Sequence, residues 1–363
     1  MGIENQLGEN KENLIENNSE MLFIYDAKMC NPNGDPDDEN KPRMDYNRNI
    51  NLVSDVRLKR YIRDYLMDYK EKVIFVCKVE GKTVDATNRL KKLIEANRKE
   101  IEADEKLKDL LGAKKEPDEK KLSDHLPWLL SKLTDVRFFG ATMPLKSEAG
   151  RGASITFTGP IQFNWGYSLN KVTGPMDTST ITSTFAGAGE DYSTMGKDYR
   201  VDYSLIAFHG IISAKRGENT ELTAEDLNLF DEAMVKAIPL EATTRSKTGQ
   251  SPLLYIRVEY NTSEFFSGDF RKYVKIVESG GKAIPFDDTA KLRSANDYKL
   301  DLAELKAKLI EHSNKISTIH FWKSDDIEVS GWDGQDGKLK GSNGDRKEIE
   351  IPIEMLLKTE KEN

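Results

Sequence analysis

The order of its apolar segments constrains the fold of this 363-residue chain most strongly. Two helices with helically spaced apolar residues alternate with strands: the first covers about residues 51–69, and the second follows a cap at Thr223. The predicted strands around them are residues 22–29, 73–79, 153–165, 201–213 and 253–260. Without its insertions, the chain has the β-α-β-β-α-β order of a ferredoxin-like α+β fold. RNA-recognition modules use such a sheet, but so do many unrelated proteins.

Further segments accompany this palm, for which we predict residues 21–80 and 135–262. They are a disordered acidic tail at 1–20, a helical insertion (fingers) at 81–134, a long loop within the palm at 167–200, and a C-terminal extension at 263–363 that packs on the palm. The extension is predicted to hold a helix at 298–313, a strand at 316–323, a mobile glycine- and charge-rich loop at 331–347, and a returning segment at 349–357.

Composition limits the classes of function. The net charge of −8 argues against a generic nucleic-acid coat but allows a local basic groove on an acidic body. No apolar run is long enough to span a membrane, and the tail lacks the apolar region of a signal peptide. The two cysteines, Cys30 and Cys77, have no metal-type spacing and fit a reducing cytoplasm, with no disulfide expected.

The connection between strand 22–29 and helix 51–69 is a candidate cradle for phosphates. Most strand-to-helix connections are about 2–6 residues, and this one is far longer and shaped by prolines and a glycine. It changes from acidic to basic and leads into a basic helix, a pattern typical of phosphate-backbone binding. On charge alone, a solvated helix face beside a variable loop is the equal alternative.

Two other loops combine polar and cationic residues. The long loop 167–200 is rich in Ser, Thr and Gly but carries scattered apolar residues that could wedge between stacked bases; a flexible surface loop is the alternative. Loop 243–251 has two cations, several hydroxyls and Gly249, which suits close backbone approach to phosphates. Such αβ loops are common, so this pattern alone is weak.

Five blocks of this sequence resemble one family. In order, they are Asn31-Pro32-Asn33-Gly34-Asp35-Pro36, Asp55-Val56-Arg57-Leu58-Lys59-Arg60, Asp135-Val136-Arg137-Phe138-Phe139-Gly140, Thr158-Gly159-Pro160-Ile161-Gln162-Phe163 and Arg245-Ser246-Lys247-Thr248-Gly249-Gln250. The first looks like the opening signature of the Cas7 family (RAMP superfamily), the RNA-coating backbone subunits of CRISPR Cascade complexes. The other four fit its type I-B branch, and the match covers about residues 20–260.

The resemblance implies a non-catalytic, cofactor-free protein that polymerises head to tail along the spacer of a CRISPR guide RNA. It would present this RNA for pairing with target DNA. Its partners would be guide RNA, target DNA through the guide, other copies of itself and other Cascade subunits, with no membrane. Loop 167–200 would be the thumb, which folds over the guide and displaces a base at intervals, and Met195-Gly196-Lys197 resembles the block at the thumb's return.

Together, the charged loops and the resemblance yield a set of candidate site residues. The RNA-binding candidates are Asn33, Arg43, Asn47, Arg48, Arg57, Lys59, Arg60, Arg137, Met195, Lys197, Arg245, Ser246 and Lys247. The thumb wedge candidates are Met176, Ile181 and Phe185. For Arg137, a structural role is at least as well supported as an RNA contact.

Two other functions stay open on the sequence. Asp35, Asp37 and Asp38 could hold a metal for phosphodiester cleavage, which would make the chain an endoribonuclease of the type III-like branch. No nucleotide-binding loop, nucleophile elbow or zinc-protease motif is present, so we predict no enzyme and no metal site. A stand-alone RNA-binding protein is the other alternative, although no aromatic RNP1-type block is present.

Overall fold

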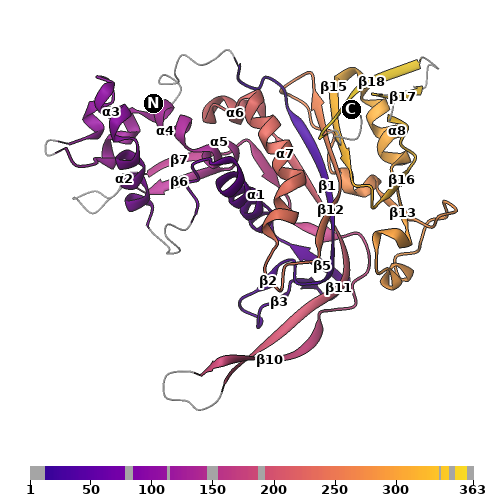
Figure 1. The fold of residues 1–363 in the computed structure, drawn as a ribbon. Coiled ribbons are helices and arrows are strands. Elements are labelled where there is room, and N and C mark those ends of the chain that lie inside the picture. Colours follow the sequence, from indigo (N-terminus) through magenta and orange to yellow (C-terminus); the bar gives the residue numbers. More distant parts are fainter. Residues whose placement is uncertain are drawn as a thin grey trace, which may run out of the picture. The chain divides into compact units, whose positions relative to one another are not determined.

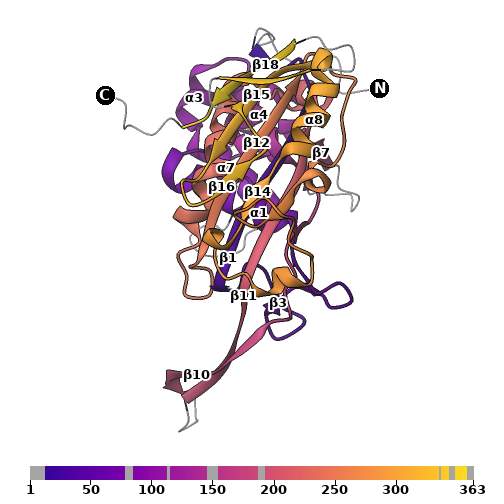
Figure 2. The same cartoon turned by 90° about the vertical axis from the view of Figure 1, so that its right-hand side faces the viewer.

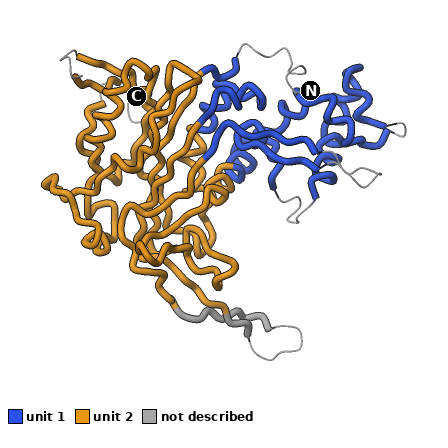
Figure 3. Tube along the Cα trace, turned by 180° about the vertical axis from the view of Figure 1, so that it is seen from behind, with its two compact units in different colours: residues 1–16, 63–162, 212–230 blue, residues 17–62, 163–211, 231–363 orange. Residues whose placement is uncertain are grey.

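A computed structural model describes residues 13–77, 85–112, 115–144, 154–186, 193–334, 337–342 and 348–357. The chain divides into two compact units, drawn in blue and orange in Figure 3. Unit 1 comprises Met1–Glu16, Arg63–Gln162 and Ile212–Phe230, and unit 2 comprises Asn17–Ile62, Phe163–Ile211 and Asp231–Asn363. The C-terminal extension thus shares a unit with the palm strands predicted at 22–29 and 253–260 and with most of the strand predicted at 201–213. The unit boundary falls within α1 (Asp55–Lys70) and α7 (Ala224–Glu241).

A large sheet forms the centre of unit 2, in the order β17-β18-β15-β12-β1-β11-β9-β5-β4. Strand β1 (Ser19–Cys30) lies between β12 (Gln250–Tyr260) and β11 (Ser193–Ile212), and Figure 2 shows these strands side by side. Strands β1 and β12 are antiparallel, with Leu22 opposite Ile256. Consecutive residues from Met21 to Tyr25 are buried, so both faces of the central strand are covered.

The C-terminal extension continues this sheet. Strand β15 (Ile316–Lys323) has the predicted bounds and pairs antiparallel with β12. Beyond it lie β18 (Glu348–Met355) and β17 (Lys338–Ser342), so part of the predicted mobile loop is a strand, while 335–336 and 343–347 are outside the described residues. The other elements of the extension are η5 (Phe270–Tyr273), β13 (Lys275–Val277), η6 (Asp288–Lys291), η7 (Ala295–Asp297), β14 (Lys299–Asp301), α8 (Ala303–Glu311), η8 (Ser313–Lys315) and β16 (Glu328–Ser330).

The prediction that 167–200 is one long loop was wrong. Strand β9 (Gly166–Ser168) opens the segment, and β10 (Met176–Ala186) pairs antiparallel with the first part of β11. We call this hairpin, residues 176–200, the arm; Figure 1 shows it projecting from the sheet of unit 2. Its threonines and Ile181 favour strands, and pairing within the hairpin satisfies backbone groups that a loop would expose to water.

The connection before α1 is also more ordered than predicted. It contains β2 (Gly34–Asp35), β3 (Lys41–Pro42), β4 (Met44–Asp45) and β5 (Ile50–Val53). Because β5 pairs with β9, helix α1 begins at Asp55 rather than near residue 51. The hydroxyl of Ser54 accepts a hydrogen bond from the Arg57 N–H (3.3 Å), which caps the new start.

Unit 1 holds the helical insertion around its own apolar core, which includes Leu90, Ile101, Leu129 and Val136. Its helices are α2 (Ala86–Ala96), α3 (Arg98–Ala103), η3 (Lys108–Leu110), η4 (Glu119–Asp124), α4 (Leu126–Lys132), α5 (Thr134–Phe139) and α6 (Ala214–Thr220). Its strands are β6 (Gly140–Pro144), β7 (Ser154–Thr158) and β8 (Ile161–Phe163), so the single strand predicted at 153–165 is interrupted at Gly159-Pro160.

Two further predictions needed correction. Residues 73–77 form no strand, because the N–H groups of Phe75 (2.7 Å) and Val76 (3.1 Å) donate to the buried Asp135 carboxylate instead of a neighbouring strand. Residues 13–20 are not a disordered tail, since β1 begins at Ser19 and Ile15 is buried; residues 1–12 lie outside the described part. Cys30 and Cys77 are free thiols, and no described helix is both long and apolar enough to cross a membrane.

Candidate nucleic-acid interface

Three segments of unit 2 meet at the base of the arm. Arg200, the last residue of the arm, connects them: its guanidinium donates to the carbonyl of Met29 (2.7 Å), the carboxylate of Asp198 (2.9 Å) and the carbonyl of Arg245 (3.3 Å). The end of β1 and the loop 243–249 are thereby attached to the arm. We call Arg57, Lys197, Arg200, Arg245 and Lys247 the arm-root cluster.

Arg57 and Lys247 lie close together without a carboxylate partner among the described residues. The Arg57 guanidinium stacks over the Tyr61 ring (3.9 Å), and its buried Nε has no hydrogen-bond partner in the described structure. The Lys247 ammonium donates to the carbonyl of Asn31 (2.6 Å). Burial, helped by the nearby Arg57 charge, lowers the pKa of Lys247 to about 8. Two like charges are thus held close together at the base of the arm.

Gly249 allows the loop 243–249 to approach β1 closely. Its φ is +110°, and a Cβ at this position would lie 2.4 Å from the carbonyl oxygen of Lys28. The Gly249 carbonyl accepts a hydrogen bond from the Lys28 N–H (2.8 Å). The Asn31 N–H donates to the Ser246 carbonyl (2.7 Å). Backbone hydrogen bonds therefore hold the loop on both sides of Lys247, at Ser246 and at Gly249. Only glycine fits this conformation and this distance without strain.

Other cations of the interface are exposed and loosely paired. Lys197 is about half exposed and lies 3.2 Å from Glu39, whose carboxylate also accepts from the Tyr199 hydroxyl (2.8 Å). These two hydrogen bonds hold the pKa of Glu39 below its usual value. Arg245 lies 3.6 Å from Asp198. The Lys197 and Arg245 side chains thus remain accessible to solvent beside their carboxylate partners.

The acidic residues of loop 31–49 hold this loop together. Asp35 pairs with Arg43 (2.9 Å), Asp38 pairs with Lys41 (2.6 Å) and Glu39 pairs with Lys197. Asp37 is exposed, and its N–H donates to Asp35 (3.2 Å). Within the described ranges, no group of three or more His, Cys, Asp or Glu side chains is arranged to hold a metal ion.

Several predicted RNA-binding residues have structural roles. Lys59 is buried and pairs with Asp55 (3.2 Å), and the Asn33 side chain accepts hydrogen bonds from the Ser54 N–H and hydroxyl (both 2.9 Å). Arg137 belongs to unit 1, where it makes a two-point ion pair with Asp226 (2.7 and 2.8 Å). Their donors and acceptors are therefore largely used inside the protein.

The remaining candidates lie on the surface or outside the described side chains. Asn47 and Arg48 are exposed in the turn before β5, where their N–H groups donate to Asp45 (3.0 and 3.1 Å). Arg60 and Ser246 are half-buried on α1 and in loop 243–249, and Met176 is half-buried at the start of the arm. Ile181, Phe185 and Met195 lie on the paired strands of the arm, but their side chains are not among those described.

Arg200, the residue that connects all three segments, is not among the site residues predicted from the sequence. Its sequence signal is slight: it lies in a short alternation of charged and apolar residues, Asp198 to Val201, that is typical of a strand rather than a loop. Its partners Met29 and Arg245 are 171 and 45 residues away, so the chain alone does not show that they meet.

Fold and site define a mixed α+β protein with a large sheet and a cationic cluster at the base of a projecting hairpin. The sequence pattern of the family described as "CRISPR-associated protein Cas7" matches residues 17–303. A Haloferax volcanii protein with the same description is 34% identical over 319 residues, or 84% of this chain and 86% of that protein. The chain therefore belongs to the Cas7 family, which confirms the family resemblance, while the type I-B branch stays a prediction.

Two solved chains show a more distant similarity, each at 13% identity. One comes from a "CRISPR RNA-guided surveillance complex, pre-nicking", with a TM-score of 0.47 over 86% of this chain and 95% of that chain. The other comes from a "CRISPR RNA-guided surveillance complex", with a TM-score of 0.43 over 86% of this chain and 94% of that chain.

Proposed function

We propose that this chain is a non-catalytic backbone subunit that coats the guide RNA of a type I-B CRISPR surveillance complex. Copies bind head to tail along the spacer and present it for pairing with target DNA, together with other subunits of the complex. The observation that carries the proposal is the placement of Arg57 and Lys247 side by side at the base of the arm, with no carboxylate partner among the described residues. Membership of the Cas7 family supports it independently.

The chemistry of this cluster fits a nucleic-acid backbone. Arginine and lysine bind phosphates by charge-assisted hydrogen bonds, which hold the strand without reading its bases. Base pairing of the guide then supplies the sequence specificity. The acidic body, with its net charge of −8, discourages binding elsewhere on the surface.

Two finer parts of the proposal concern fold and catalysis. A ferredoxin-like palm is supported by the position of β1 between β12 and β11, with α1 after β1 and α7 before β12. The absence of catalysis is supported by the roles of Asp35, Asp38 and Glu39, which pair with Arg43, Lys41 and Lys197. A cytoplasmic location stays a prediction.

Salt titration tests the phosphate contacts. The double variant R57Q/R245Q should bind RNA of every sequence more weakly than the parent, because both residues would contact the phosphate backbone of the RNA and not its bases. The slope of log affinity against log salt should flatten by about 0.7 for each lost contact on single strands. The control is Lys291→Gln, which removes an exposed cation of η6 outside the arm-root cluster. Unchanged affinity and slope in the double variant would contradict the proposal.

A further inference from the structure

Trp165 is a large aromatic side chain that the proposed function has not used. It lies between β8 and β9, and 47% of it is exposed. A single exposed tryptophan needs no explanation by itself. The backbone at Trp165, however, is fixed by buried contacts within unit 2, which distinguishes it from an isolated exposed side chain.

A buried arginine fixes the backbone at Trp165. The Nη1 of Arg271 donates to the Trp165 carbonyl (2.7 Å), and its guanidinium lies over the Tyr167 ring (4.3 Å). Arg271 is only 6% exposed, and Asp269 neutralises it through two hydrogen bonds (2.9 and 2.7 Å). The next residue, Gly166, lies so close to the Phe208 ring that a Cβ there would be 2.5 Å from it. Trp165 thus projects from a rigid backbone.

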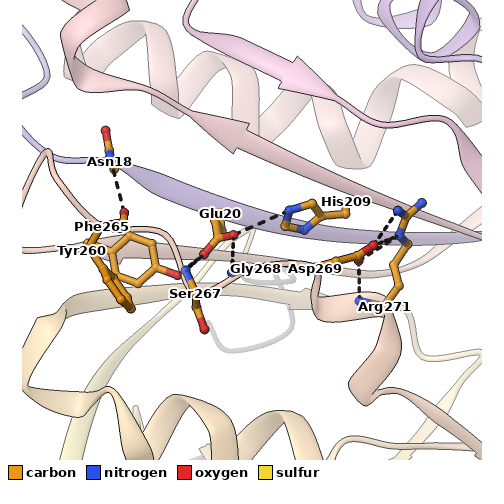
Figure 4. A network of polar contacts seen from close by, with 9 residues as sticks. All are labelled: Asn18, Glu20, His209, Tyr260, Phe265, Ser267, Gly268, Asp269 and Arg271. Atoms are coloured by element: carbon orange, nitrogen blue, oxygen red, sulfur yellow. Dashed lines mark hydrogen bonds and ion pairs between the residues drawn. The ribbon is translucent and has the colours of Figure 1, made fainter.

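Figure 4 shows how the Asp269–Arg271 pair is itself positioned. The buried Glu20 carboxylate accepts hydrogen bonds from the N–H groups of Ser267 and Gly268 (2.9 Å for Gly268) and from the Tyr260 hydroxyl. His209 lies 3.6 Å from Glu20. This network holds the segment before Asp269 against β1. Burying charged groups is costly, and the buried Arg271 at the end of this segment donates to the Trp165 carbonyl.

Trp165 is also continuous with the candidate nucleic-acid interface. The Arg43 guanidinium lies 5.9 Å from the centroid of the Trp165 ring, within the range of a cation–π contact. Arg43 N–H donates to the Asn33 carbonyl (3.0 Å), and Asn31, two residues before Asn33, accepts from Lys247 (2.6 Å). The loop 31–43 therefore carries contacts both to the arm-root cluster and to Trp165.

We propose that Trp165 is a stacking platform for an unpaired nucleobase of the bound RNA strand, with Arg43 beside it. This inference rests on the proposed function. Aromatic rings placed beside a cationic groove bind single strands by stacking on successive bases, whatever their identity. Arg271 is a positioning residue that keeps the indole in place. The cations hold the backbone of the strand, and Trp165 holds one of its bases.

The test uses nucleic-acid-free full-length protein and a single-stranded RNA of mixed sequence. W165A should weaken RNA binding about five- to 150-fold, the range that corresponds to the loss of one stacked base. The salt slope should not change, because no phosphate contact is lost. W165F should retain most of the affinity, since phenylalanine still stacks. RNA should quench tryptophan fluorescence in the parent and in the control W128F, and much less in W165F.

The outcomes distinguish a failure of this inference from a failure of the proposed function. If the parent binds RNA while W165A binds equally well and W165F is quenched like the parent, the inference fails and the proposed function stands. If W165A leaves RNA binding intact but reduces self-association, the surface contacts another copy of the chain and the inference also fails. If the parent binds no RNA, both fail. Because Trp165 is half exposed, W165A should fold, which its melting temperature checks.

Discussion

The fold places the positive charge of Lys247 where burial makes that charge energetically unfavourable. Its ammonium is half-buried beside Arg57, and burial together with this neighbour lowers its pKa from 10.5 to about 8. An unfolded chain therefore binds more protons than the folded protein between about pH 8 and 10.5, so this residue makes stability rise with pH over that range. A bound phosphate raises the pKa of Lys247, because it favours the protonated ammonium.

The affinity for RNA should therefore fall as pH rises through about 8. Between pH 7 and 9, loss of the single Lys247 charge should weaken binding by up to about tenfold. In K247M, affinity should be lower at pH 7 and nearly independent of pH over this range. The matched control is K197M, because the pKa of Lys197 is raised rather than lowered. It should bind more weakly but keep the pH dependence, and a K247M curve parallel to the parent's would refute the assignment.

A second charged residue matters for stability rather than binding. Arg257 on β12 is almost fully buried, and its guanidinium makes a two-point ion pair with Asp231 of α7 (2.7 and 2.9 Å). The Tyr255 hydroxyl donates to the same carboxylate (2.6 Å). This cluster lies beside the central strand of the sheet and lets a charged side chain occupy the core of unit 2.

Removing one partner of this pair should be costly. D231N removes the charge of the two-point partner and leaves the buried Arg257 guanidinium with only the longer contact to Glu259 (3.5 Å), so we expect unfolding free energy to fall by about 3–5 kcal/mol. Chemical denaturation measures this change. The control K215Q removes an exposed lysine that pairs with Glu218, and it should stay within about 0.5 kcal/mol of the parent. A D231N variant as stable as this control would show that the pair is not needed.

The arm is the element on which the functional proposal depends most. Its strands are antiparallel at the base, with Met176 opposite Arg200 and Thr180 opposite Lys197, and the register shifts between Asp177 and Thr180. Arg200 attaches this base to β1 and to loop 243–249. The base thus belongs to the cationic cluster, and the rest of the hairpin extends beyond the sheet (Figure 1).

Replacing residues 175–195 by a short Gly-Ser link should show which properties depend on the projecting hairpin and which depend on the base of the arm. The sheet should stay folded, because the core residues of β11 from Tyr199 onward are retained. Backbone contacts through Arg57 and Lys247 should also remain. What should disappear is the regular displacement of bases along the guide, which chemical probing of unstacked bases reports. The parent should show periodic reactivity and the variant a flat pattern; periodic reactivity in the variant would disprove the thumb role.

Some elements could be predicted because their signals are local. Strand β15 has the predicted bounds, and Thr223 caps α7 as expected, since its hydroxyl accepts from the Asp226 N–H (3.2 Å). The errors arose where contacts with residues distant in the sequence determine the local structure. The Asp135 carboxylate accepts from the N–H groups of Phe75 and Val76, which a strand at 73–79 would have paired with a neighbouring strand. The structural role of Arg137, an alternative that the sequence left open, likewise depends on Asp226, which is 89 residues away. Periodicity along the chain shows neither contact.

At the scale of the whole molecule, the central claim is that an acidic protein binds RNA at one cationic place and repeats that contact along a strand. The net charge of −8 makes copies repel one another, so the RNA and the contacts between copies must overcome this repulsion. A head-to-tail contact repeats without closing, which gives an open filament on a long strand. Each added copy should then cover the same length of RNA.

The most direct test is the length of RNA that the protein protects from nuclease. Protein is added to a long single-stranded RNA in increasing ratio, and the protected fragments are sized after digestion. The proposal predicts a ladder of fragments whose lengths increase in equal steps and whose longest members accumulate as protein increases. No protection, or a continuous smear of lengths at every ratio, would contradict the claim that this chain coats RNA as a regular backbone.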